Sequence, residues 1–147
     1  MSPVKLHDRI LIPSTNSRIS SAGSAAQKYG PPDIPLPEKT TLMQVQDFLQ
    51  QTAQRLPAKT ALICDGRRLS YAEIDVEANR LAHALIENNV QRGDRVGLYL
   101  NNSIETVVAI FAVLKAGAVF VPLNHTMKHD KLAYVLNNCR AKALLRD

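Results

Sequence analysis

The sequence is poor in aromatic residues: it contains no tryptophan, three phenylalanines and four tyrosines. Nucleic-acid bases commonly stack on aromatic side chains, and this composition supplies few of them. The formal net charge is +5, but the charges are scattered. Residues 1–40 hold five basic and three acidic residues, and residues 41–147 hold thirteen and ten. Because no basic stripe forms, we expect no nucleic-acid partner.

Long hydrophobic runs and a cysteine framework are absent as well. The longest apolar run, residues 107–114, has eight residues, whereas a membrane-spanning helix needs about 20. A secretory signal is not expected, because the apolar stretch 10–12 is short and Pro13 interrupts it. The two cysteines, Cys64 and Cys139, form no C-x-x-C motif, which indicates reduced thiols. We therefore expect a cytoplasmic protein without a membrane span.

Proline is concentrated near the N-terminus. Six of the eight prolines lie within the first 37 residues, and proline fixes φ and removes a backbone donor. We therefore interpret residues 1–39 as an extended, partly disordered leader and residues 40–147 as the folded region. The serines and basic residues of the leader also resemble an organelle transit peptide, which is the alternative interpretation.

The folded region begins with a predicted helix and a predicted hairpin. Apolar spacing favours a helix over residues 42–56, with a capping-box pattern at Thr41 and Gln44. Two extended runs, 60–64 and 67–69, then flank an Asp-Gly pair. Such a pair suits a type I′ turn, because both central residues need positive φ, so we expect a β-hairpin.

The remainder alternates between helices and strands. Ser70 and Glu73 form a full capping box at the start of a predicted helix that ends near Asn89. Residues 104–114 are apolar nearly all round, so this helix needs cover on both sides. Residues 118–121 are continuously apolar, which is typical of a buried parallel strand. The further predicted elements are strand 95–100, helix 103–115, helix 132–139 and strand 143–145.

This order predicts an α/β fold. Strands that alternate with helical crossovers indicate an open parallel sheet, here preceded by an N-terminal helix and a β-hairpin. The sequence stops at Asp147, on the end of a predicted strand. A strand at that place normally continues into a loop and a partner, so we expect the sheet to be incomplete.

Three segments resemble the adenylate-forming superfamily, which includes AMP-forming acyl-CoA synthetases and the adenylation domains of peptide synthetases. Residues 69–85 (LSYAEIDVEANRLAHAL) are similar to its first core motif. Residues 114–124 (LKAGAVFVPLN) are similar to its second. The linking stretch 92–103 (RGDRVGLYLNNS) matches in order and spacing. The resemblance covers about residues 41–147, and it implies the N-terminal portion of an AMP-forming ligase domain.

The resemblance implies a two-step reaction. A carboxylate attacks the α-phosphate of Mg·ATP to give an acyl-adenylate, and a thiol of coenzyme A or of a carrier then displaces AMP. The family's phosphate loop, ribose-binding aspartate and catalytic lysine all lie downstream of the two motifs seen here. ATP, Mg²⁺ and CoA are thus implied for a complete family enzyme. We assign none of them to this segment, nor any catalytic residue, and we expect the segment alone to be inactive.

The glycine spacing leads to the same expectation without the family. The closest two of the six glycines, Gly93 and Gly97, are four residues apart. Neither G-x-G-x-x-G nor G-x-x-x-x-G-K-[ST] occurs, so the common phosphate cradles are missing.

Candidate binding residues follow from the predicted sheet. Ligands of open parallel sheets sit beyond the carboxyl ends of the strands. Asn102 and Ser103 follow one predicted strand, and Asn124 and His125 follow the next. We interpret these four residues as a candidate rim of a substrate or nucleotide crevice, with caps and turns as the alternative.

Other side chains are not assigned to a site. His125 and His129 are four residues apart, but no third zinc ligand or H-E-x-x-H pattern accompanies them, so we expect no metal site. Lys115 resembles a lysine of the second motif, and we assign it an interaction with the helix C-terminus rather than catalysis.

The favoured hypothesis is an N-terminal segment of an acid–CoA ligase. Peptide-synthetase relatives usually continue with Asp and spaced prolines after Pro-Leu, whereas this sequence continues with residues 124–128 (NHTMK). The alternatives are a peptide-synthetase fragment, a non-catalytic interaction module or truncated-gene remnant, and a flavodoxin-like nucleotide binder. The expected partners are the missing C-terminal part of the ligase or a second copy, since helix 104–114 predicts exposed apolar surface. The acid substrate is not predicted.

Overall fold

The computed structural model describes residues 10–11 and 43–147. Most of the predicted leader, residues 1–39, therefore lies outside the described residues. The elements are β1 (Ile10–Leu11), α1 (Val45–Arg55), β2 (Thr60–Cys64), β3 (Arg67–Ser70), α2 (Tyr71–Glu87), β4 (Arg95–Tyr99), α3 (Ile104–Lys115), β5 (Val119–Pro122), α4 (His129–Asn138) and β6 (Ala141–Arg146).

The first helix begins later than the sequence indicates. Its N-cap is Gln44, whose backbone N–H donates to the Asp47 carboxylate at 2.7 Å. This cap lies three residues after the predicted one, and Thr41 is outside the described residues. Asp47 explains the difference. It lies at the third helical position after Gln44, where its carboxylate accepts a hydrogen bond from the Gln44 N–H, and in the predicted box the Gln44 side chain would have played this part for Thr41.

The predicted hairpin and second helix are confirmed. Asp65 and Gly66 have φ values of 48° and 76°, as a type I′ turn requires. Ser70 caps α2, because the Glu73 N–H donates to its hydroxyl at 3.3 Å and its own N–H donates to the Glu73 carboxylate at 2.7 Å. The predicted apolar stripe of α2 is buried: Ile74, Ala78, Leu81, Ala82 and Leu85.

The main sheet has the strand order β1-β6-β4-β5. The strands β6, β4 and β5 are parallel, and β1 pairs antiparallel with β6. This arrangement confirms the predicted α/β fold with a small parallel sheet. The hairpin forms a separate two-stranded sheet.

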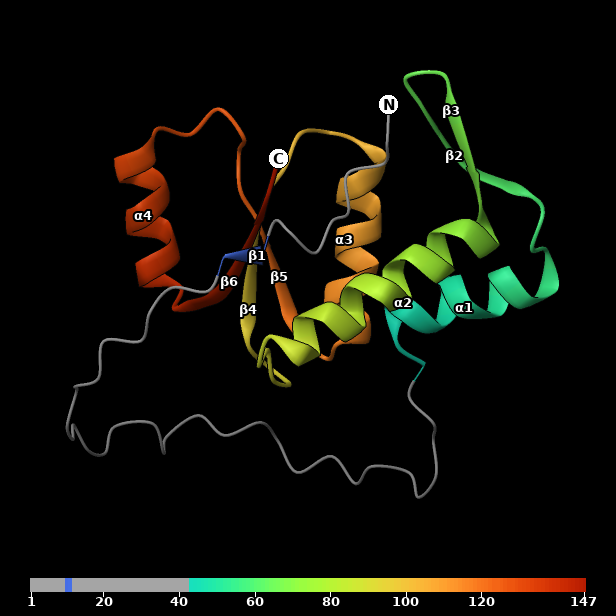
Figure 1. Ribbon diagram of the computed structural model, residues 1–147, viewed down its shortest axis with the longest axis horizontal. Coiled ribbons are helices and arrows are strands. Elements are labelled where there is room, and N and C mark those ends of the chain that lie inside the picture. Colours follow the sequence, from blue (N-terminus) through green and yellow to red (C-terminus); the bar gives the residue numbers. More distant parts are fainter. Residues whose placement is uncertain (1–9, 12–42) are drawn as a thin grey trace, which may run out of the picture.

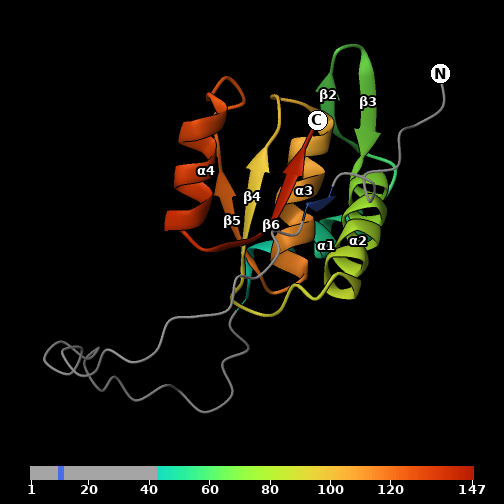
Figure 2. The same cartoon turned by 60° about the vertical axis from the view of Figure 1, so that its left-hand side comes forward.

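The helices cover both faces of this sheet. The helices α1, α2 and α3 lie on one side, and α4 lies on the other (Figures 1 and 2). Val96 and Leu98 of β4 are buried in the core formed with α2 and α3, whereas Gly97, between them, faces Leu136 of α4. This alternation is that of a strand with both faces covered.

Strand β5 is less buried than its sequence indicates. Val119 is 50% exposed, and the strand has no fully buried residue. The prediction of a buried strand is wrong because β5 lies at an edge of the described sheet rather than inside it. The strand pairs in parallel with β4, as its continuous apolar run predicted, but the run did not indicate how far its two faces are covered.

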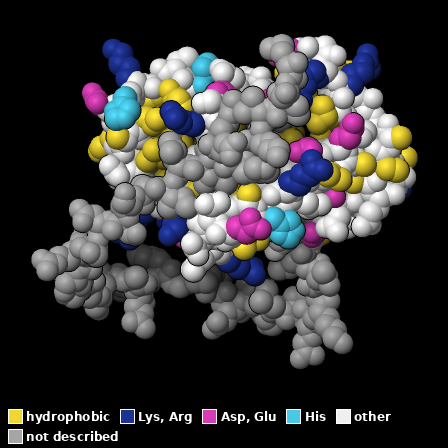
Figure 3. Space-filling model, viewed as in Figure 1, with side chains coloured by type: hydrophobic (Ala, Val, Ile, Leu, Met, Phe, Trp, Pro, Cys, Tyr) yellow, Lys and Arg dark blue, Asp and Glu magenta, His cyan; other side chains and the backbone are white. Residues whose placement is uncertain are grey.

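Charges are distributed without a dominant patch on the face shown in Figure 3, where side chains of both signs lie among hydrophobic ones. Across residues 10–11 and 43–147, no helix combines the length and the apolar character that a membrane crossing requires.

Candidate functional site

The candidate rim lies at the carboxyl ends of β4 and β5. The two strands are parallel, with Leu98 of β4 opposite Pro122 of β5. The loops that follow these two strands therefore lie at the same end of the sheet, and the tip of the β2–β3 hairpin points in the same direction (Figure 2). The structure thus places Asn102 and Ser103 on one loop of this edge and Asn124 and His125 on the neighbouring loop.

The loop after β4 is tied to the end of β6. The backbone N–H and the side-chain Nδ2 of Asn101 donate to Asp147 Oδ2 at 2.9 and 2.8 Å. The Asn101 carbonyl in turn accepts a bond from the Thr106 hydroxyl. Asn101 therefore connects two strand ends to the first turn of α3, which is a structural role.

Asn102 and Ser103 lead into α3. Ser103 occupies the N-cap position, in line with the alternative interpretation of these residues as caps and turns, but its side chain makes no capping hydrogen bond. The side chain of Asn102 is not used as a cap either, and its carbonyl lies 4.0 Å from Cys64 Sγ of the hairpin. The amino end of α3 thus has no capping side chain at its N-cap position, although the Glu105 carboxylate in the first turn accepts a hydrogen bond from its own backbone N–H.

The loop after β5 is held by its own side chains. Asn124 Oδ1 accepts bonds from the Thr126 N–H at 2.9 Å and from the Thr126 hydroxyl at 2.8 Å. The Tyr99 hydroxyl donates to the Met127 carbonyl at 2.9 Å and fixes the loop to β4. The Asn124 side chain thus closes a turn that contains no proline after Pro122. His125 projects from the same turn and is exposed.

The hairpin contributes charge to this edge. Arg67 Nη1 lies 3.0 Å from Glu105 Oε1 on the first turn of α3. Desolvation alone would raise the pKa of Glu105, but hydrogen bonds from its own backbone N–H and from Arg67 lower it, so the carboxylate stays ionised. The pKa of the nearby Cys64 thiol is raised by desolvation and by the Asp65 carboxylate. A raised pKa opposes thiolate formation, so Cys64 is a poor nucleophile.

Lys115 has a partner that the sequence analysis did not anticipate. Its Nζ lies 2.8 Å from Asp75 Oδ1 and 2.7 Å from Asn79 Oδ1, both on α2. The Lys115 and Asp75 side chains are only 12% and 18% exposed. Asp75 and Asn79 are four residues apart on α2 and so share a face. In the sequence, this spacing could have indicated that the two side chains bind one partner on a neighbouring element. Lys115 therefore joins α2 to α3.

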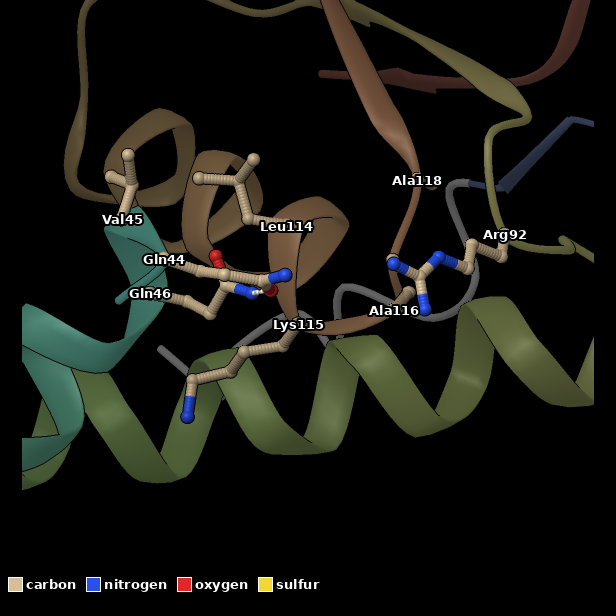
Figure 4. A pocket seen from close by; sticks show the side chains of 9 residues that line it. Gln44, Val45, Gln46, Arg92, Leu114, Lys115, Ala116 and Ala118 are labelled. Carbon is tan, nitrogen blue, oxygen red and sulfur yellow. Dashed lines mark hydrogen bonds between the residues drawn. The ribbon is translucent and has the colours of Figure 1, made fainter. Parts of the chain in front are cut away.

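A shallow cavity of about 550 Å³ lies at the other end of the parallel strands, near the amino ends of β4 and β5. It is lined by the N-cap Gln44 and the first two residues of α1, Val45 and Gln46, by Arg92, and by residues 114–118, which run from the end of α3 to the start of β5. Figure 4 shows that the Lys115 side chain points toward α2. Because Arg92 and residues 114–118 lie before the amino ends of β4 and β5, this cavity does not coincide with the rim where parallel sheets bind ligands.

The two histidines do not share a helix face. His129 is the first residue of α4, with its Nδ1 3.8 Å from Asp130 Oδ1, whereas His125 lies in the preceding turn. In the part of the chain that the structure describes, no three His, Cys, Asp or Glu side chains group around a possible metal position.

Part of this chain is similar in sequence to proteins of known function. The family model described as AMP-binding enzyme matches residues 49–147. A medium/long-chain-fatty-acid–CoA/3-oxocholest-4-en-26-oate–CoA ligase of Mycobacterium marinum is 37% identical over 105 residues, which are 71% of this chain and 19% of that protein. Surfactin synthase subunit 2 of Bacillus subtilis is 38% identical over 103 residues, 70% of this chain and 3% of that protein.

A solved structure agrees with the fold. The N-terminal subdomain of Klebsiella oxytoca NpsA, in complex with 3-hydroxyanthranilyl-AMSN, superposes with a TM-score of 0.66 at 33% identity. The match covers 70% of this chain and 26% of that one. The chain thus spans about a fifth of the length of the ligase relatives that it matches. With two thirds of its residues inside the family match, the chain belongs to the AMP-binding enzyme family of adenylate-forming enzymes.

Proposed function

We propose that residues 49–147 form the N-terminal segment of an ATP-dependent, AMP-forming acid–CoA ligase. The complete enzyme would join a carboxylic acid to AMP and then transfer the acyl group to the thiol of coenzyme A. The observation that carries this proposal is the family match over residues 49–147, together with 37% identity to a fatty-acid–CoA ligase of which the chain spans 19%.

The described residues do not by themselves form a binding site for a nucleoside triphosphate. Backbone N–H groups of a glycine-rich loop normally cradle phosphates, and a carboxylate holds the Mg²⁺. The glycines among the described residues lie elsewhere: Gly66 in the hairpin turn, Gly93 and Gly117 before the amino ends of β4 and β5, and Gly97 inside β4. Asp147 at the rim accepts two bonds from Asn101. The segment therefore supplies a sheet, a rim and a helix end, and the reacting groups would come from other residues of the ligase.

Coenzyme A is the proposed thiol acceptor because of the loop after β5. Here Asn124 closes the turn with Thr126, where peptide-synthetase relatives usually have Asp and spaced prolines. The second candidate is a segment of a peptide-synthetase adenylation domain, which the 38% identity to surfactin synthase subunit 2 favours. The two candidates differ in the second step, since a carrier-bound pantetheine would replace coenzyme A.

A chimera tests the proposal. Residues 49–147 replace the matching segment of the Mycobacterium marinum ligase, and a parallel chimera uses surfactin synthase subunit 2. We expect the first chimera to form acyl-AMP and then acyl-CoA from a fatty acid, ATP, Mg²⁺ and CoA. A folded ligase chimera that forms neither product would contradict the proposal. Acyl-AMP without acyl-CoA, alongside an active peptide-synthetase chimera, would favour the second candidate.

A further inference from the structure

The buried faces of α2 and α3, which pack against each other, are rich in alanine (Figures 1 and 2). Four core residues of these helices are alanines that are 6% exposed or less: Ala78, Ala82, Ala109 and Ala112. The crossing of two helices is fixed by side-chain ridges of one helix that fit the grooves of the other, and alanine forms only a low ridge. The apolar contact therefore defines the placement of α3 on α2 less sharply than larger side chains would.

One polar cluster, the Lys115 cluster of Lys115, Asp75 and Asn79, joins the two helices. Lys115 Nζ donates to Asp75 Oδ1 at 2.8 Å and to Asn79 Oδ1 at 2.7 Å. Asn79 Nδ2 in turn donates to Asp75 Oδ2 at 3.2 Å. Each side chain thus contacts the other two, and a hydrogen bond weakens steeply once its distance or angle departs from the optimum. Within residues 43–147, no other side-chain hydrogen bond or ion pair connects α2 to α3.

The Lys115 cluster shares its helix faces with the alanines. Asp75 lies three residues before Ala78, and Lys115 lies three residues after Ala112. The Lys115 and Asp75 side chains are largely shielded from water, and a buried ion pair is often replaced by apolar residues without loss of stability. What apolar residues do not replace is the directionality of its hydrogen bonds. The cluster therefore supplies the definition of placement that the alanine contact lacks.

The length of α3 carries this placement to the candidate rim. A helix rises about 1.5 Å per residue, so Ile104 lies about 16 Å along the axis from Lys115. A tilt of about 10° at the Lys115 end would therefore move the amino end of α3 by about 3 Å. Asn102 and Ser103 directly precede that end, so they would be displaced with it.

We propose that Lys115 is a positioning residue: through Asp75 and Asn79 it sets the placement of α3 on α2, and thereby the position of the rim residues Asn102 and Ser103. The inference rests on the proposed function only for the use of the rim. Its experiments measure structure and need neither ATP nor a carboxylic acid. A failure here would therefore leave the ligase proposal unaffected, and an inactive ligase chimera would leave this inference unaffected.

The first experiment removes the ion pair and keeps the helices. In the full chain, Asp75→Leu/Lys115→Met replaces both charges by apolar residues of high helix propensity, and the exposed Asn79 binds water instead. We expect a urea midpoint close to that of the wild type but shifted amide resonances at residues 101–106. The lost charges are screened beyond about 10 Å in 0.1 M salt, so shifts at the far end of α3 report its movement.

Two matched variants separate placement from stability. The control Glu77→Gln/Arg80→Gln removes an ion pair of the same length, 2.8 Å, that lies within α2 and is exposed, and it should leave residues 101–106 unchanged. The exchanged variant Asp75→Lys/Lys115→Asp restores the attraction between the helices. Its aspartate at the carboxyl end of α3 opposes the helix dipole, so we expect a lower urea midpoint. Its resonances at residues 101–106 should nevertheless return toward those of the wild type.

The resonances of residues 101–106 decide the proposal. It is supported if they shift in the apolar variant and return in the exchanged variant, because a purely stabilising role of Lys115 would make them follow the urea midpoint instead. Wild-type resonances in the apolar variant, or equal shifts in the control variant, would overturn it. If the apolar variant does not fold, the exchanged variant decides alone: once circular dichroism shows that it is folded, displaced resonances at residues 101–106 would overturn the proposal as well.

Discussion

Gly97 is the position at which the packing of α4 on the sheet is most sensitive to one methyl group. A Cβ atom placed on Gly97 would lie 2.9 Å from Leu136 Cδ2, 3.0 Å from Leu144 Cδ1 and 3.2 Å from Leu123 Cδ1. Carbon atoms in good contact are about 3.5–4.0 Å apart, so Gly97→Ala overlaps three side chains at once.

The expected cost is moderate, because two effects oppose one another. Overpacking costs about 1–3 kcal/mol, and the loss of backbone freedom in the unfolded chain returns about 0.4–1 kcal/mol. All three neighbours are ends of leucine side chains, which move more easily than backbone. We therefore expect Gly97→Ala to lower the free energy of unfolding by about 1 kcal/mol in urea denaturation followed by circular dichroism.

A double-mutant cycle separates this overlap from a general loss of stability. Leu136→Ala alone should cost about 1–2 kcal/mol, since Leu136 is only half-buried. It also removes the nearest atom, so the double variant should be more stable than the sum of the two single effects indicates. An unchanged urea midpoint for Gly97→Ala, or purely additive effects, would refute the proposed packing of α4 against β4.

Three further changes test the helix junctions and the hairpin. Lys115→Met leaves the Asp75 carboxylate without its cation and should cost about 2 kcal/mol, measured by urea denaturation; an unchanged midpoint would contradict the α2–α3 link. Backbone and side-chain bonds from Ser70 lower the pKa of Glu73, so its stabilisation is present above about pH 4.3 and lost as pH falls through the lowered folded value. The stability difference between wild type and Glu73→Gln should therefore shrink as the pH falls below about 4.3, and a constant difference would contradict the cap. Gly66→Ala, at φ 76°, should cost about 1 kcal/mol in thermal unfolding through backbone strain alone, since no atom lies within 4 Å of the added methyl; a fall of several kcal/mol would show that the turn is packed.

Local patterns predicted the individual elements well. The Asp-Gly turn and the Ser70–Glu73 capping box depend on interactions between residues at most three positions apart, and both are present. The stripe of α2 was predicted because a period of 3.6 residues identifies the buried face without knowledge of the neighbour.

Properties that depend on distant parts of the chain were predicted poorly. Whether β5 lies inside the sheet or at its edge depends on which strands flank it, and its own apolar run does not encode that. The partner of Lys115 lies 40 residues earlier on α2, so only the packing of two helices revealed it. The pairing of β1 with β6 joins the two ends of the chain and has no local signal.

The sequence predicted which residues follow the carboxyl ends of β4 and β5, but not the hydrogen bonds that these residues make. The rule for parallel sheets placed Asn102, Ser103, Asn124 and His125 at one edge, which is where the structure has them. It could not anticipate that the Asn124 side chain closes its own turn, because such bonds depend on loop geometry. The binding roles of these four residues remain predictions.

The most direct test concerns the purified 147-residue chain by itself. It is incubated with ATP, Mg²⁺ and a panel of carboxylic acids, and acyl-AMP and pyrophosphate are quantified by mass spectrometry and a coupled assay. If the groups that grip the triphosphate lie outside this segment, neither product will rise above the level of a protein-free control. Acyl-AMP formation at ordinary enzymatic rates, about 1 s⁻¹ or faster, would contradict that account.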